Sequence, residues 1–155
     1  MLSRRLLPVA GVICLSLSAQ AVKFFTDDTV PVGLTSSCTT AFVADVDCDP
    51  VVPALQSGEY YPNTTLIRAC TARCRSSLAL FQTTIAAACG RETWEGYDDN
   101  PMSVVLIPEL MRYHYNLTCL FSGGQFCNNV AAAYAAHLDP DATGNDGMKA
   151  RPFFK

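Results

Sequence analysis

Cysteines give this chain its most specific chemistry. Of eight in the sequence, Cys14 lies within the first 21 residues, and seven follow: Cys38, Cys48, Cys70, Cys74, Cys89, Cys119 and Cys127. No two of them are separated by only two residues and the two histidines stand alone, so the ligand spacing of a zinc site is absent. In an exported chain such a set predicts disulfide bonds and no metal.

An odd number of cysteines after residue 21 leaves one without a partner in the same chain. Cys119 and Cys127 flank a segment in which Gly123-Gly124 can reverse the chain, so they are the favoured local pair. Cys70 and Cys74 are one helical turn apart and are expected to reach two different partners. The leftover thiol is either buried and inert, bonded to a segment outside this sequence, or available to link two chains as a disulfide dimer.

Trp94 and Tyr97 lie among the acids Glu92, Glu95 and Asp98. Aromatic faces can stack on sugar rings while carboxylates accept hydrogen bonds from hydroxyl groups, so both aromatics are candidate carbohydrate contacts. The alternative, which we favour, is that the lone tryptophan anchors its loop to the core. The acids crowd one stretch and are expected to be solvated rather than to flank a cleft as glycosidase carboxylates do.

Two Asn-x-Thr sequences are acceptors for N-linked glycosylation in a secreted chain. They begin at Asn63, which follows the turn-forming Tyr61-Pro62, and at Asn116, which falls within a predicted helix. Asn63 has a second interpretation as a helix cap, a role that a glycan on its amide would compromise. Thr64 could then cap that helix instead.

Catalytic chemistry has little support in the sequence. His114 and His137 are the only side chains with ordinary pKa values near neutrality, and neither belongs to a recognised motif. There is no Gly-x-Ser-x-Gly nucleophile turn. Alternating aspartates over residues 45–49 lack the glycine and glutamate that complete a calcium loop. We therefore predict no catalytic residue, no cofactor and no enzymatic activity.

The first 21 residues have the form of a secretory signal peptide. Arg4 and Arg5 precede an apolar run over residues 6–17, which is too short for a bilayer core that needs about 20 residues. Ala19-Gln20-Ala21 then predicts cleavage before Val22, a secreted extracellular chain and no membrane anchor. Cleavage leaves nine Lys and Arg against fourteen Asp and Glu. Such an acidic domain is repelled by phosphate backbones, which excludes nucleic acid as a partner.

Helical periodicity runs through the remaining chain, so the fold class is predicted to be all-α: a small disulfide-stapled helical domain of about four to six helices. The expected organisation is a signal peptide over residues 1–21, an irregular arm over 22–35, a cysteine-rich helical domain over 36–140, and a disordered tail or linker start over 141–155. About 134 residues after cleavage suit one domain.

The clearest helix is expected over residues 64–89. Apolar residues recur there every three or four positions, at Leu66, Cys70, Cys74, Leu78, Phe81, Ile85 and Cys89. Gly90 follows as a C-cap, and a break near Ser76-Ser77 would give two helices in the same register. Three cysteines on one face indicate that neighbouring elements are tied covalently to this helix.

Further helices are expected over residues 40–46, 50–56, 108–117 and 129–138, with a loop over 91–103. In the third, Leu110, Met111, His114 and Leu117 fall on one side. In the last, Val130, Tyr134 and Leu138 form the expected buried stripe. Strand signals are weak throughout.

Several segments together resemble a known family. Residues 38–50 read CTTAFVADVDCDP, residues 87–99 AACGRETWEGYDD and residues 112–120 RYHYNLTCL, and residues 126–130 continue with FCNNV. These segments resemble the cysteine-rich N-terminal region of secreted fungal LysM-domain proteins over roughly residues 36–140. In that family the region precedes LysM modules, which bind chitin or related N-acetylglucosamine polymers. The chain has no Gly-Asp-Thr after a short strand, so the ligand residues of a LysM module have no positions here.

The resemblance implies a secreted, non-catalytic domain associated with the fungal cell wall or extracellular space. Chitin is then a partner only through a LysM module that this sequence lacks. Within this family, a sequence that ends at Lys155 is expected to be either a truncated gene product or a lone N-terminal domain. The alternative function is a small helical carrier of lipid or sterol, of the kind represented by elicitins, whose cysteine spacing this chain does not share.

Overall fold

One long helix, α3 (Ala72–Cys89), forms the axis of the fold. The computed structural model describes residues 21–56, 58–95 and 100–138. α3 begins where the Thr71 side chain accepts a hydrogen bond from the Cys74 amide at 3.1 Å, and it ends at Gly90, whose φ of 57° stops the helix. Its buried side chains are Cys74, Leu78, Phe81, Ile85 and Cys89, which confirms this part of the predicted stripe.

The single helix expected over residues 64–89 is two helices in the structure. α2 (Asn63–Ala69) ends at Cys70, and Thr71 is extended with φ −100° and ψ 152°. The break lies here and not at Ser76-Ser77, because the Thr71 hydroxyl caps a new helix. Ser77 stays helical, and its Oγ accepts a hydrogen bond from the Asp47 amide at 2.9 Å.

Three disulfides tie the centre of the fold to its neighbours. Cys89 is bonded to Cys38 in α1 (Ser36–Phe42), Cys74 to Cys48 just after β2 (Asp45–Asp47), and Cys70 to Cys119 at the end of α4 (Leu106–Thr118). Cys70 and Cys74 therefore reach different partners, as predicted. Two of these disulfides join α3 itself to α1 and to the residue after β2. The third joins Cys70, just before the Thr71 cap of α3, to the end of α4.

The predicted local pair of Cys119 with Cys127 is wrong. The amide of Cys127 donates to the Leu120 carbonyl at 2.8 Å, so Cys127 lies opposite Leu120 and is offset by one residue from Cys119. Such an offset places neighbouring side chains on opposite faces of a hairpin. Cys119 is instead buried beside Cys70, with 5.3 Å between the Cα atoms, and Cys127 is unpaired within the described residues.

The remaining helices differ from their expected bounds for local reasons. α1 begins at Ser36 rather than residue 40, because Thr35 accepts from the Cys38 amide and is itself held by Glu92. Residues 50–56 form only the 3-10 turn η1 (Val52–Ala54), entered through a hydrogen bond from the Val51 amide to Asp49. α4 (Leu106–Thr118) and α5 (Cys127–Leu138) start about one half-turn earlier than expected.

Three short antiparallel strand pairs complete the fold of the described residues; β1 and β2 are separated by α1, and the other two pairs are hairpins. β1 (Ala21–Lys23) pairs with β2, β3 (Thr93–Glu95) with β4 (Pro101–Ser103), and β5 (Phe121–Ser122) with β6 (Gln125–Phe126). The last reverses at Gly123-Gly124, whose φ values of 59° and 82° suit a two-residue turn, as predicted. The loop expected over 91–103 is thus partly the β3–β4 hairpin.

The N-terminal arm packs on the body, although beyond β1 it has no regular secondary structure up to residue 35. β1 starts at Ala21, and beyond it the Phe24 ring stacks on Phe81 with 5.9 Å between centroids. The Phe25 ring meets Phe42 edge-on at 5.2 Å. The signal peptide is predicted over residues 1–21, of which residues 1–20 lie outside the described residues, as does the predicted tail over 141–155.

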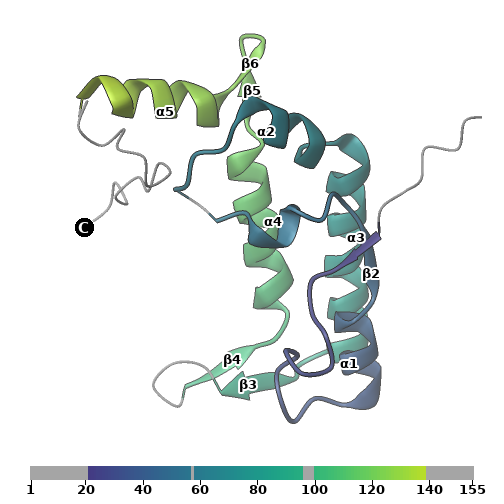
Figure 1. Ribbon diagram of the computed structural model, residues 1–155. Helices are drawn as coiled ribbons and strands as arrows, with labels where there is room; N and C mark the ends of the chain where they lie inside the picture. The colour runs from purple at the N-terminus through teal and green to yellow at the C-terminus, as the bar shows by residue number, and fades with distance from the viewer. Residues whose placement is uncertain (1–20, 57, 96–99, 139–155) are drawn as a thin grey trace, which may run out of the picture.

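Figure 1 shows α3 and α4 side by side, with α1 against one end of α3 and α5 extending from the β5–β6 hairpin away from the body. Helices dominate the described residues, so the all-α, disulfide-stapled fold class is confirmed. The apolar core lies between α1, α3, α4 and β2.

The two predicted helix faces are covered to different extents. On α4, Met111 packs against the core and His114 is half-buried, whereas Leu110 and Leu117 are exposed. The fully buried residues of this helix are Pro108, Tyr115 and Thr118. On α5, Val130 and Tyr134 are 46% and 64% exposed instead of buried. The contacts of α5 are mainly with β6, so the body does not cover this helix.

Candidate functional site

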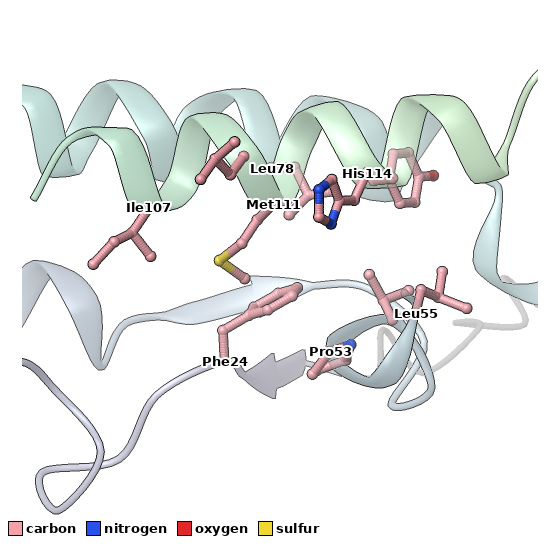
Figure 2. A pocket seen from close by; sticks show the side chains of 10 residues that line it. Phe24, Pro53, Leu55, Leu78, Ile107, Met111 and His114 are labelled. Carbon is pink, nitrogen blue, oxygen red and sulfur yellow. The ribbon is translucent and has the colours of Figure 1, made fainter. Parts of the chain in front are cut away.

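An apolar groove of about 260 Å³ lies between α4 and the segments facing it. Figure 2 shows one wall built from α4 and the other from the arm and η1. The labelled side chains on the two walls are Ile107, Met111 and His114 from α4, and Phe24, Pro53 and Leu55 opposite, with Leu78 of α3 behind. The groove is a candidate for binding a small apolar group.

The fold positions both walls. Ile107, Met111 and His114 recur at helical spacing, so α4 presents them together. On the opposite wall, stacking on Phe81 holds Phe24. η1 follows Cys48, which is bonded to Cys74, so a disulfide ties this wall to α3, against which α4 packs.

Polar chemistry in the groove is sparse. His114 is half-buried at its edge, and the residues that line the groove include no carboxylate. The Tyr115 hydroxyl lies 3.1 Å from the carbonyl oxygens of both Ala69 and Thr71, where it can donate its one proton. Burial of the phenol raises the pKa of Tyr115 above its usual range. The groove therefore offers an apolar surface and a single imidazole, not an acid–base pair.

A wider and more open hollow of about 740 Å³ lies between α2, the β5–β6 hairpin and the start of α5. Ile67, Phe121 and Phe126 supply its apolar surface, and Asn63 and Asn129 its polar rim. The Asn63 Oδ1 accepts a hydrogen bond from Asn129 Nδ2 at 3.2 Å. Cys127, half-buried, is the first residue of α5. A disulfide dimer through this thiol stays a prediction.

The structure gives Trp94 a packing environment. Trp94 pairs with Met102 across the β3–β4 hairpin and packs, half-buried, against the core. Its indole Nε1 is buried and has no hydrogen-bond partner in the described residues. Tyr97 lies outside those residues. The carbohydrate contact predicted for these two aromatics stays a prediction, and the burial of Trp94 supports the interpretation as an anchor.

The acids have structural partners. Glu92 accepts from the Thr35 amide at 2.9 Å and from its hydroxyl at 2.6 Å, which fixes the start of α1. Asp47 pairs with Arg73 at 2.8 Å, and Asp49 with Arg68 at 3.1 Å. Hydrogen bonding to Arg68 is the main cause that lowers the pKa of Asp49. Within the described residues, no group of three or more His, Cys, Asp or Glu side chains could hold a metal ion.

Both glycosylation acceptors are exposed. Asn63 is the first residue of α2, where Pro62 is the cap, so the predicted side-chain cap is not seen at Asn63. Asn116 lies on α4. Use of either acceptor stays a prediction.

The chain matches the family described as secreted LysM effector N-terminal domain over residues 25–134. It belongs to this family. The matched range contains the six bonded cysteines, Cys127 and every residue that lines the groove except Phe24. The family's domain is therefore the disulfide-stapled body described above. The predicted resemblance is confirmed, and the chain is a secreted protein.

Two relatives give the same result. A LysM domain-containing protein of Arthroderma benhamiae is 34% identical over 135 residues, which cover 87% of this chain and 24% of the relative. The secreted LysM effector Vd5LysM of Verticillium dahliae is 34% identical over 115 residues, which cover 74% of this chain and 17% of the relative. The chain thus spans less than a quarter of the length of these relatives. No solved structure matches it.

This LysM effector N-terminal domain has no membrane-spanning candidate among the helices that the structure describes. Sequence reasoning placed Met111 and His114 on one side of a predicted helix, which is one wall of the groove, but it predicted no groove. It missed Phe24 on the opposite wall. The only available signal was a pair of aromatics, Phe24-Phe25, in a segment without periodicity.

Proposed function

We propose that this domain acts outside the cell as a non-catalytic module of LysM effector proteins, and that it does not itself recognise chitin. The observation that carries the proposal is the family match over residues 25–134, which spans the whole stapled body. Contact with cell-wall polysaccharide then comes from LysM modules, which occupy other parts of such proteins.

Trp94 and the groove support this division of labour. Sugar-binding sites use exposed aromatic faces beside hydrogen-bonding groups, whereas Trp94, the candidate carbohydrate contact that the structure describes, packs against the core. The groove under α4 lacks the carboxylates that would flank a glycosidic bond. Neither Trp94 nor the groove therefore has the groups needed to bind or hydrolyse an N-acetylglucosamine polymer.

Sedimentation with insoluble chitin tests the proposal. The secreted domain alone is expected to stay in the supernatant, as a non-binding control protein does, while a version with a LysM module fused after Lys155 is expected to sediment. The matched variant is Trp94→Phe, which keeps an aromatic ring against the core. Saturable sedimentation of the lone domain would overturn the proposal, and its loss in Trp94→Phe would assign the binding to Trp94; hydrolysis of chitin oligomers would overturn the proposal as well.

The groove favours one other candidate function, the carriage of a small apolar ligand. Its lining is almost wholly apolar, but about 260 Å³ lies below the roughly 300–1,000 Å³ of pockets that take drug-sized ligands. A short acyl chain suits this volume better than a sterol. Native mass spectrometry of the secreted protein would reveal such a ligand. Met111→Trp, which fills the groove, should then release it, while Leu80→Trp on the exposed face of α3 should not.

A further inference from the structure

An apolar stripe of partly exposed side chains runs along α4 from Leu110, which also lines the groove, to the residue after the end of the helix. Leu110, Tyr113 and Leu117 are 46%, 58% and 40% exposed and recur every three or four positions; Leu120, 51% exposed, follows the end of the helix. We call these four side chains the outer stripe. Single exposed apolar residues are ordinary, but a continuous row of them usually marks a surface that something covers.

Asn116 lies beside the outer stripe. It is exposed, it opens the acceptor sequence Asn116-Leu117-Thr118, and it follows Tyr113 by one helical turn. Side chains on a helix lean toward its N-terminus, and residues three apart have Cβ atoms about 5–6 Å from each other. A group attached to the Asn116 amide is therefore directed over the Tyr113 ring.

We infer that Asn116 carries an N-linked glycan whose first sugars cover the outer stripe. The apolar ring face of N-acetylglucosamine packs against Tyr113, while its hydroxyl and acetamide groups face water. In the modification, a bond forms between Asn116 Nδ2 and the anomeric carbon of the oligosaccharide. The bond from that carbon to a lipid-linked pyrophosphate donor breaks, and the amide gives up one proton. A secreted chain passes through the compartment that supplies this donor.

The burial of Thr118 sets the order of events. An acceptor needs a hydroxyl residue two positions after the asparagine, and Thr118 is only 4% exposed once α4 has packed. The glycan is therefore added before α4 closes on α3. Asn116 itself stays at the surface, so the folded domain accommodates the sugar.

Asn63 provides the matched comparison. It is also exposed and also opens an Asn-x-Thr sequence, but it lies at the start of α2 and its Oδ1 accepts a hydrogen bond from Asn129. A glycan on its Nδ2 would lie at the junction of α2 with α5. Loss of the Asn63 acceptor should therefore leave the outer stripe covered.

The test uses the full chain secreted from a yeast host. Asn116→Gln should remove one endoglycosidase-sensitive step in electrophoretic mobility. In sedimentation velocity, the wild-type protein and Asn63→Gln should stay monomeric, whereas Asn116→Gln should associate increasingly with concentration and bind more of a hydrophobic dye. Absence of glycan at Asn116 in the secreted wild-type protein would overturn the inference.

A second variant separates covering from folding. Adding Tyr113→Lys and Leu117→Lys to Asn116→Gln makes the outer stripe polar without a glycan, so it should restore the monomer. Continued association of this triple variant would refute the covering role. A monomeric Asn116→Gln protein with unchanged dye binding would refute it as well.

Discussion

α3 and α5 are both helices that periodicity predicted, yet the fold treats them in opposite ways. α3 is packed along one face, with five side chains buried and disulfides at both ends. α5 contacts mainly β6, and its predicted stripe residues Val130 and Tyr134 face solvent. Figure 1 shows the same contrast, with α3 packed beside α4 and α1 in the body and α5 extending from it. Helical spacing therefore predicts the helix but not whether another element covers it.

The largest expected effect follows from cutting a staple of α3. Replacing Cys38 and Cys89 with alanine opens a loop with a sequence separation of 51 residues. The chain-entropy estimate for such a loop is about 4 kcal/mol of unfolding free energy. Urea denaturation should show this loss. Cys127→Ala, at the start of α5, should change the midpoint little because that thiol is unpaired within the described residues. Equal losses of unfolding free energy from the two changes would contradict the contrast drawn between α3 and α5.

Sequence reasoning could predict α3 because its signals agree: apolar spacing, a following glycine and cysteines on one face. It could not place the break at Thr71. The Thr71 hydroxyl can cap α3 only because Cys70, the residue before it, lies outside that helix. Cys70 is held there by its disulfide to Cys119, a residue far away in the sequence. The groove was not predicted. The helical spacing of Met111 and His114 was visible in the sequence, whereas Phe24 reaches the opposite wall through stacking on Phe81, a contact between residues far apart in sequence.

Core truncation compares the two helices directly. Ile85→Ala on α3 removes a fully buried side chain and should cost about 2–5 kcal/mol of unfolding free energy. Tyr134→Ala on α5 removes an exposed one and should change it by no more than about 0.5 kcal/mol. Thermal or urea unfolding measures both. A large loss from Tyr134→Ala would mean that α5 packs against a surface in solution.

Tyr115 tests how firmly α4 belongs to the stapled body. Its hydroxyl is the hydrogen-bond donor that links α4 to the carbonyls of Ala69 and Thr71 at the α2–α3 break. Tyr115→Phe keeps the ring but leaves those buried acceptors one donor short, so it should cost about 1–3 kcal/mol. Hydrogen exchange should then quicken at the end of α4. Tyr113→Phe, on the exposed side of the same helix, is the control and should be neutral.

The smallest effect concerns the ion pair of Asp49 with Arg68, which links the start of η1 to α2. Hydrogen bonds from Arg68 and the Val51 amide lower the pKa of Asp49 in the folded state. Because its folded pKa lies below its unfolded pKa of about 3.9, the stabilisation is present above that pH and is lost as pH falls through the folded pKa.

Asp49→Asn should therefore cost up to about 1 kcal/mol at pH 7, and the difference from wild type should shrink below about pH 4. Unfolding free energies measured from pH 7 to pH 2 would show the convergence, with the exposed Asp28→Asn as control. Asparagine still accepts from the Val51 amide, so a difference that persists at pH 2 would assign the effect to packing rather than charge. The charge of the ion pair would then contribute nothing to the unfolding free energy of the stapled body.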